Sequence, residues 1–331
     1  MANSKKRVLS GIRATGRLHL GNYLGMVKGM IGLQESKEYE PFFMVADLHA
    51  MTTPYDPESL RRNVREVVLD YLAAGLNPEK ASVFVQSLVR EHVELAYLFS
   101  TVVSIARLSH LPTYKEKVKQ YPENNTLALL YYPVLMASDI LLYKTQALPV
   151  GDDQLPHLEI AREIAKKMNE KYGTDFPEPQ QMKTEGHYVP SLTGEGKMSK
   201  SVEGSYINLT DSLEEIKRKL AKVPTDSGTQ RGSIPEIGGV RSLYVFYKLY
   251  FPDDFEELFE KPYKSGRIRY DTIKNSLAER IYNELVPIQE KRRVLEAKPE
   301  HVDKVLIDGA EKARKIAQLT LEEVKEKMGL K

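Results

Sequence analysis

The chain of 331 residues contains no cysteine. This absence excludes disulfide bonds, thiolate nucleophiles, cysteine-ligated zinc and iron–sulfur clusters. Its seven histidines show no spacing such as His-x-x-x-His, so we expect no transition-metal site built by the protein. No apolar run reaches the ~18 residues that a membrane-spanning helix needs.

An excess of charge of one sign is also lacking, because 48 Lys and Arg face 46 Asp and Glu, for a net charge of +2. Net charge therefore predicts neither nucleic-acid nor membrane binding, and any basic surface must be local. The charged N-terminus is not followed by the apolar segment of a secretion signal, so we expect a cytoplasmic protein. The 41% apolar and 28% charged residues are typical of a folded chain with about two domains.

The first half alternates short apolar runs with amphipathic stretches of helical spacing, such as 57–72 and 155–168. Continuous apolar runs are typical of parallel strands that are buried on both faces. The predicted strands are Val8–Ile12, Phe42–Ala46, Ala81–Val85 and Leu148–Val150, with Tyr188–Val189 as a weaker fifth. This order predicts an α/β fold with a doubly wound, Rossmann-like parallel sheet.

After about residue 190 the strand signals stop. Glycines among Lys and Ser predict a mobile loop over 193–204. Asp211-x-x-Glu214 predicts a capping box, and apolar spacing predicts long helices over 273–288 and 305–328. We expect a catalytic domain over 1–192, the loop over 193–204 and an all-helical domain over 205–331.

The segment from Ser10 to Gly25 leads from the first strand into a helix and is rich in glycine. Such a turn presents free backbone amides and the positive end of a helix dipole, which favours phosphate. Asn22 stands where a Walker loop needs lysine, which argues against a P-loop. The Gly-x-Gly-x-x-Gly pattern is absent as well, so the segment lacks the fingerprint of a dinucleotide-binding site. In His19-Leu20-Gly21-Asn22, His19 and Asn22 can donate to phosphate oxygens and Gly21 leaves room for a nucleoside. The alternative is that His19 only caps the helix.

A second segment, Gly194 to Ser201, carries Lys197 and Lys200 three residues apart between glycine hinges. Two ammonium groups on a flexible loop suit a pyrophosphate whose charge grows in a transition state. The alternative is a solvated basic loop.

His-Leu-Gly-Asn and Lys-Met-Ser-Lys-Ser together resemble the two signatures of class I aminoacyl-tRNA synthetases, and the whole chain resembles the bacterial tryptophanyl-tRNA synthetases. The resemblance implies a ligase that activates L-tryptophan with ATP and Mg²⁺ to an adenylate and transfers it to the terminal adenosine 2′-OH of tRNA(Trp). It also implies a homodimer and a helical domain that binds the tRNA anticodon. Candidate tRNA contacts are Lys291–Arg293 and Lys312–Lys315, whose alternative is a solvated helix face.

The segment Tyr132–Leu141 resembles the part of the family that holds tryptophan. Asp139 would accept the indole N–H, Met136 would form an apolar wall, and Tyr132 would meet the α-amino group. By itself the segment favours the plainer interpretation, an amphipathic helix with a Met and an Asp at helical spacing. The full tryptophan-binding set that the resemblance implies is Leu9, Gly11, His49, Tyr132, Met136, Asp139 and Gln154.

The same resemblance implies the groups that act on ATP. Lys117 would reach the phosphates, with Lys115 as the alternative. The implied ATP-binding set is Arg13, Ala14, Thr15, Gly21, Asn22, Gly151, Asp152, Asp153, Val189, Lys197, Met198, Ser199, Lys200 and Ser201. The implied catalytic set is His19, Asn22, Lys117, Lys197 and Lys200.

The chain departs from the family at Ala14, where proline is usual, at Arg13, where glutamine is common, and at Leu9, where phenylalanine is common. These departures bear on ATP affinity and on the shape of the tryptophan pocket. Three other functions stay open: a tyrosyl-tRNA synthetase, a small-molecule nucleotidyltransferase, and a binding protein without activity. The last should have lost the two loop lysines, and both are present.

Overall fold

The computed structural model describes residues 5–183, 188–200, 202–229 and 232–331. Five parallel strands form one sheet in the order β3-β2-β1-β4-β5. The strands are β1 (Lys6–Arg13), β2 (Tyr39–Ala46), β3 (Ser82–Val85), β4 (Ala147–Leu148) and β5 (Gln180–Gln181). The chain runs from β1 outward to β3 and then returns to the other side of β1, so the topological switch point lies between β1 and β4.

Helices connect these strands and make up the second half of the described chain. Those of the first half are α1 (Leu20–Asn22), continued by a π-helical turn (Tyr23–Val27), α2 (Lys28–Glu35), α3 (Asp47–Ala50), α4 (Pro57–Ala74), α5 (Glu91–Ser100), α6 (Ile105–Ser109), α7 (Pro112–Gln120), α8 (Leu127–Leu141) and α9 (Leu155–Tyr172). Those of the second half are α10 (Leu213–Ala221), α11 (Gly239–Tyr250), α12 (Lys261–Lys264), α13 (Tyr270–Glu296) and α14 (Pro299–Lys327).

The predicted α/β class and four of the five predicted strands are confirmed, and the fifth strand is wrong. The predicted fifth strand was Tyr188–Val189, whereas the fifth strand of the observed sheet is the two-residue β5, which is polar and offers no apolar run to detect. Tyr188 is 63% exposed, and the carbonyl of Val189 accepts a 2.9 Å bond from the Met198 amide instead of joining the sheet.

The predicted capping box is displaced by one residue. Ser212 caps α10, and its amide donates to Glu215 Oε2 over 2.7 Å. Asp211 instead accepts a 2.9 Å bond from the Asn208 amide and pairs with Lys219. Because Asp and Ser are both good N-cap residues, the pattern alone could not decide between adjacent frames.

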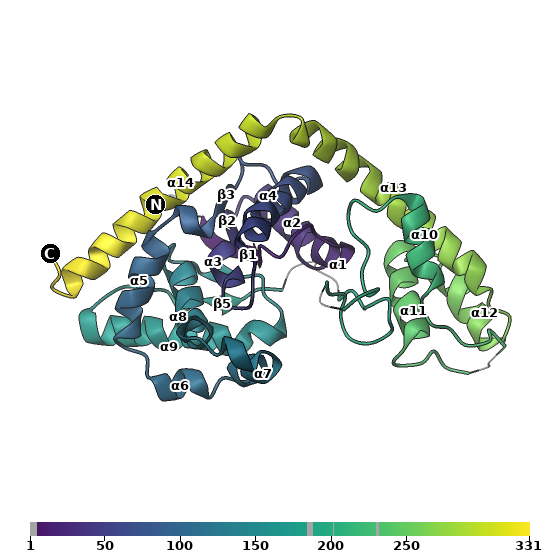
Figure 1. Ribbon diagram of the computed structural model, residues 1–331, viewed down its shortest axis with the longest axis horizontal. Coiled ribbons are helices and arrows are strands. Elements are labelled where there is room, and N and C mark those ends of the chain that lie inside the picture. Colours follow the sequence, from purple (N-terminus) through teal and green to yellow (C-terminus); the bar gives the residue numbers. More distant parts are fainter. Residues whose placement is uncertain (1–4, 184–187, 201, 230–231) are drawn as a thin grey trace.

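The two longest helices, α13 and α14, form a bent roof over the sheet (Figure 1). α13 leads away from α10, α11 and α12, and α14 returns along β3 and α5. Small residues allow this approach: Ala313 is fully buried, and a side chain at Gly309 would collide with the carbonyl of Val83. The predicted long helices are confirmed, but the second of them packs on the sheet and not only on the helical part.

Two apolar cores lie on the two faces of the sheet. One joins β1 and β2 to α2, α4, residues 189–209 and α10–α13, and the other joins the sheet to α5, α8, α9 and α14. The first core matters for the site because it unites the two predicted signature segments. In the part of the chain that the structure describes, no helix combines the length and apolar character needed to cross a bilayer.

Candidate functional site

A cavity of about 650 Å³ opens at the carboxyl ends of β1, β2 and β4, beside the switch point. This is where ligands bind in open α/β sheets. Its floor comes from the strands, and its walls come from α7, α8 and the start of α9. Every residue of the predicted tryptophan-binding set lines it: Leu9, Gly11, His49, Tyr132, Met136, Asp139 and Gln154.

Among the described residues that line the cavity, Asp139 is the one buried carboxylate, with 2% of its surface exposed. Gln86 Nε2 donates to both of its oxygens over 2.8 and 3.0 Å. His49 Nε2 lies 2.7 Å from Oδ2, and His92 Nδ1 lies 2.7 Å from Oδ1. Burial raises the pKa of Asp139, but the charge and hydrogen bonds of the two imidazoles have the larger effect and lower this pKa to about 2. Asp139 therefore presents a permanent negative charge to the cavity at pH 7.

A second polar cluster lies on the same wall. The Tyr132 hydroxyl lies 2.6 Å from His157 Nε2, and it donates to Thr113 Oγ1 over 3.0 Å. His157 is 3% exposed, and its burial lowers its pKa, which keeps the imidazole neutral. These contacts hold the Tyr132 ring in one orientation at the cavity wall.

Positive charge enters the cavity at its rim. Lys197 Nζ lies 3.6 Å from Asp153 Oδ2, and both side chains are exposed. Lys117 also lines the cavity, while the alternative Lys115 does not. Arg13 is half-buried there and donates to Thr53 Oγ1 over 3.1 Å. The rim can thus neutralise a polyanion above the apolar floor.

The His19 turn lies next to this rim. His19 is the N-cap of α1: its Nδ1 accepts from the Asn22 amide over 3.3 Å, and Asn22 Oδ1 accepts from the His19 amide over 3.1 Å. Burial, helped by the charge of Lys200, lowers the pKa of His19 to about 4, so the ring is neutral at pH 7. The structure therefore shows the capping role, which the sequence analysis kept as an alternative to phosphate binding.

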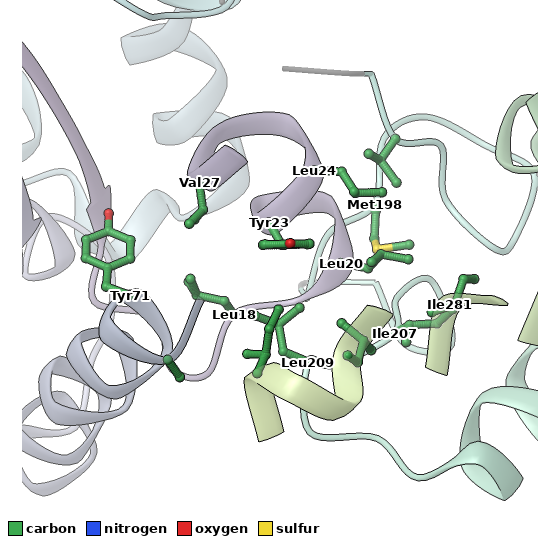
Figure 2. Packing of buried hydrophobic residues seen from close by; sticks show 14 of the residues in the cluster. Leu18, Leu20, Tyr23, Leu24, Val27, Tyr71, Met198, Ile207, Leu209 and Ile281 are labelled. Carbon is green, nitrogen blue, oxygen red and sulfur yellow. The ribbon is translucent and has the colours of Figure 1, made fainter. Parts of the chain in front are cut away.

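The second signature segment is docked on the first. Met198 is 4% exposed, and its sulfur accepts a 3.2 Å bond from the Gly21 amide. A methyl group at Gly21 would lie 2.9 Å from the His19 ring and 3.0 Å from Met198 Cβ, so only glycine fits. Figure 2 shows Met198 beside Leu20 and Leu24 in the first core.

Lys200 is half-buried near Gly16, and its burial lowers its pKa to about 8 against the opposing charges of Asp70 and Glu66. The structure thus brings Met198 and Lys200 close to the His19 turn, but only Lys197 of the three predicted cationic and histidine groups lines the cavity.

The other predicted ATP residues are spread around this centre. Ala14 and Val189 are buried in the first core, while Thr15, Gly151 and Asp152 are exposed and do not line the cavity. The backbone of Ser199 is bonded to Ser205. Ser201 lies outside the described residues. Their roles toward ATP stay predictions.

The predicted basic clusters are partly wrong. Arg292 is 3% exposed and pairs with Glu66 and Asp70, so it cannot reach an external phosphate. Lys312 donates to the carbonyl of Pro78 over 2.9 Å and Arg314 to the carbonyl of Leu88, which fastens α14 to the flanks of β3. A run of basic letters does not reveal such internal partners.

Three residues near the buried groups were not predicted from the sequence. His157 lines the cavity, while Gln86 and His92 do not line it and instead contact Asp139. Gln86 directly follows β3, at the same sheet edge as the ends of the other strands, and this position was an available signal. His92 offered none, because its contact with Asp139 depends on the packing of α5 on α8. Among the described residues, no group of three or more His, Asp or Glu is arranged to hold a metal ion.

A family model described as tRNA synthetases class I (W and Y) matches residues 1–286. The chain belongs to this synthetase family. A tryptophan–tRNA ligase of Caldanaerobacter subterraneus subsp. tengcongensis is 42% identical over 98% of each chain, and that of Thermotoga maritima is 41% identical over 98% of this chain and 99% of the relative.

Among solved class I synthetases, the tryptophanyl-tRNA synthetase of Campylobacter jejuni in complex with ADP and tryptophan is similar to this chain. It has a TM-score of 0.85 and 34% identity, and the match covers 98% of this chain and 99% of that one. The resemblance to tryptophanyl-tRNA synthetases that the sequence indicated is confirmed by these full-length relatives.

Proposed function

We propose that the chain is a tryptophan–tRNA ligase that acts in the cytoplasm. The observation that carries this proposal is the cavity at the switch point, which has an apolar floor, a buried carboxylate and a cationic rim. An indole ring has a large apolar face and a single N–H donor, and Asp139 and Met136 offer the complementary surface. Full-length relatives with this activity support the same reading.

The first step joins tryptophan to ATP, which enters as its Mg²⁺ complex. A carboxylate oxygen of tryptophan attacks the α-phosphorus, the bond from that phosphorus to the bridging oxygen breaks, and pyrophosphate leaves with the electron pair. No general base is needed, because the attacking carboxylate is already ionised at pH 7. Lys197, Lys200 and Lys117 stabilise the charge that grows on the leaving group.

His19 contributes to this step as a neutral group. With its pKa near 4 and its Nδ1 committed to the Asn22 amide, it keeps Nε2 available as a donor to phosphate. In the second step the 2′-OH of the terminal tRNA adenosine attacks the carbonyl carbon of the adenylate. AMP leaves, and the hydroxyl proton passes to its phosphate or to solvent.

The experiment is pyrophosphate exchange into ATP with each of the twenty amino acids. We expect exchange with tryptophan alone. Exchange with tyrosine would transfer the chain to the tyrosine branch of the same family, and exchange with none would reject the proposed adenylation. Charging of tRNA(Trp) by the same preparation tests the second step.

We also propose that two copies of the chain associate. Apolar side chains on α5 and α6 face solvent: Val93 is 53%, Tyr97 71% and Ile105 75% exposed. Large apolar side chains left exposed in this way are typical of a surface that is covered in a complex, and a second copy of the chain would cover them symmetrically. Light scattering should give twice the monomer mass, and Tyr97→Asp with Ile105→Asp should give the monomer mass. An unchanged mass would move the interface elsewhere.

A further inference from the structure

A buried carboxylate lies directly behind the His19 turn. Asp70 on α4 has no exposed surface, and its Oδ2 accepts a 2.5 Å hydrogen bond from the Leu18 amide. Its Oδ1 accepts a bond from the guanidinium of Arg292 on α13. Three segments that are distant in sequence, namely α4, the turn before α1, and α13, therefore meet at one side chain.

Each of the three guanidinium nitrogens of Arg292 donates a hydrogen bond at this junction. Its Nη2 donates to Glu66 Oε2 over 2.6 Å, and its Nε donates to Glu296 Oε1 over 2.9 Å. Only 3% of the Arg292 side chain is exposed. Loss of any one partner would leave an uncompensated charge in the protein interior, which is costly. The planar guanidinium, bonded on several sides, therefore holds its partners in fixed positions.

The same turn is held from its other side by α13 as well. Leu209 donates from its amide to the Leu18 carbonyl over 3.2 Å, and Gln289 of α13 donates to the Leu209 carbonyl over 2.9 Å. Figure 2 shows Leu18 in the core between Tyr71 of α4 and Leu209. The position of Leu18, and with it the start of the His19 turn, is thus set by α4 and α13 together.

The junction also acts on the second signature segment through charge. Burial lowers the pKa of Lys200 to about 8, while Asp70 and Glu66 favour its ammonium form and Arg17 opposes it. Arg17 itself is bonded to Glu66 over 2.5 Å. Both signature segments therefore respond to the same group of buried charges.

We propose that Asp70 and Arg292 are positioning residues for adenylate formation, acting through the Leu18 amide to fix the His19 turn relative to Lys200. The proposal rests on the proposed function. Neither side chain lines the cavity, and both are buried among protein groups, so neither touches a bound substrate. Their effect must therefore appear in the chemical step and not in tryptophan binding.

The test is tryptophan-dependent pyrophosphate exchange by the full chain, with kcat and both KM values measured. Asp70→Asn keeps an oxygen for the Leu18 amide but removes the charge that holds Arg292. We expect kcat to fall about 10- to 100-fold, since a shift of about 1 Å in a catalytic group costs this much, and the KM for tryptophan to stay near the wild-type value. Arg292→Lys should act in the same direction, and the double variant should be no worse than Asp70→Asn alone.

Asp303→Asn is the matched control. It removes the 2.7 Å pair between Arg65 and Asp303, which also joins α4 to the C-terminal helices but is exposed and away from the turn. Melting temperatures are measured for every variant, and Arg292→Lys decides the question if Asp70→Asn does not fold. A lowered melting temperature with a kcat equal to that of Asp303→Asn would overturn the positioning role. A wild-type chain without tryptophan-dependent exchange would instead reject the proposed function.

Discussion

Asp139→Asn tests how the cavity reads the indole ring. Asparagine keeps the volume and one acceptor oxygen of this side chain but removes its charge. Alanine is less informative, because it would leave Gln86, His49 and His92 facing an apolar gap. An unpaired buried donor costs about 1–3 kcal/mol, and several together approach the ~5–15 kcal/mol that stabilises a typical protein.

The size of the expected effect follows from the loss of charge. A hydrogen bond to an ionised group contributes about 1.5–3 kcal/mol and a neutral one about 0.5–1.5 kcal/mol. The substitution should therefore remove about 1–2 kcal/mol of preference for an N–H donor. This corresponds to a fall of about 5- to 30-fold in the ratio of kcat/KM for tryptophan over phenylalanine.

The assay is pyrophosphate exchange with each amino acid, together with thermal melting. Ser138→Ala is the matched control, because Ser138 is the next residue on α8 and is also buried, but it bonds to the His92 carbonyl. The control should lower the melting temperature and leave the ratio unchanged. A folded Asp139→Asn variant with an unchanged ratio would show that another group reads the indole N–H.

Three further variants test the phosphate side. Lys197→Ala should lower exchange by about 10²–10³, while calorimetry shows tryptophan binding unchanged; near-wild-type exchange would remove Lys197 from the reaction. Lys200 loses its proton as pH rises through its pKa of about 8, so kcat/KM for ATP should fall above that pH. Lys200→Arg should abolish this fall, because arginine keeps its charge. The same fall in the Arg variant would show that another group causes the pH dependence. Met198→Ala should destabilise the fold by about 2–5 kcal/mol and raise the KM for ATP, whereas Met198→Leu should stay close to wild type. A normal KM for ATP in a destabilised Met198→Ala variant would show that Met198 packs in the core without affecting ATP binding.

Patterns that depend on neighbours in sequence were readable before the structure. The apolar run at Val8–Ile12 and the helical spacing over 57–72 depend only on residues that are near one another in the chain, and both elements formed where they were predicted. β5 could not be predicted in this way, because two glutamines form a strand only where β4 supplies hydrogen-bonding partners.

The site shows the same limit. The family resemblance led to Asp139, and the structure places it on the cavity wall, but its binding role stays a prediction. Asp70 could not be found from sequence, because a carboxylate on a helix looks solvent-exposed until Arg292 and the Leu18 amide are brought to it. Met198, expected in a mobile loop, is buried for a related reason, since its partner Gly21 lies in a distant segment.

The return of α14 along β3 has a consequence for how the protein is made. β3 is an outer strand of the sheet, and Lys312 and Arg314 bond to the chain at both of its ends. An uncovered outer strand can pair with another chain and start aggregation. Because α14 leaves the ribosome after all five strands, β3 is an uncovered edge strand until this helix packs on it. Chains truncated before Pro299 should therefore aggregate as they are synthesised.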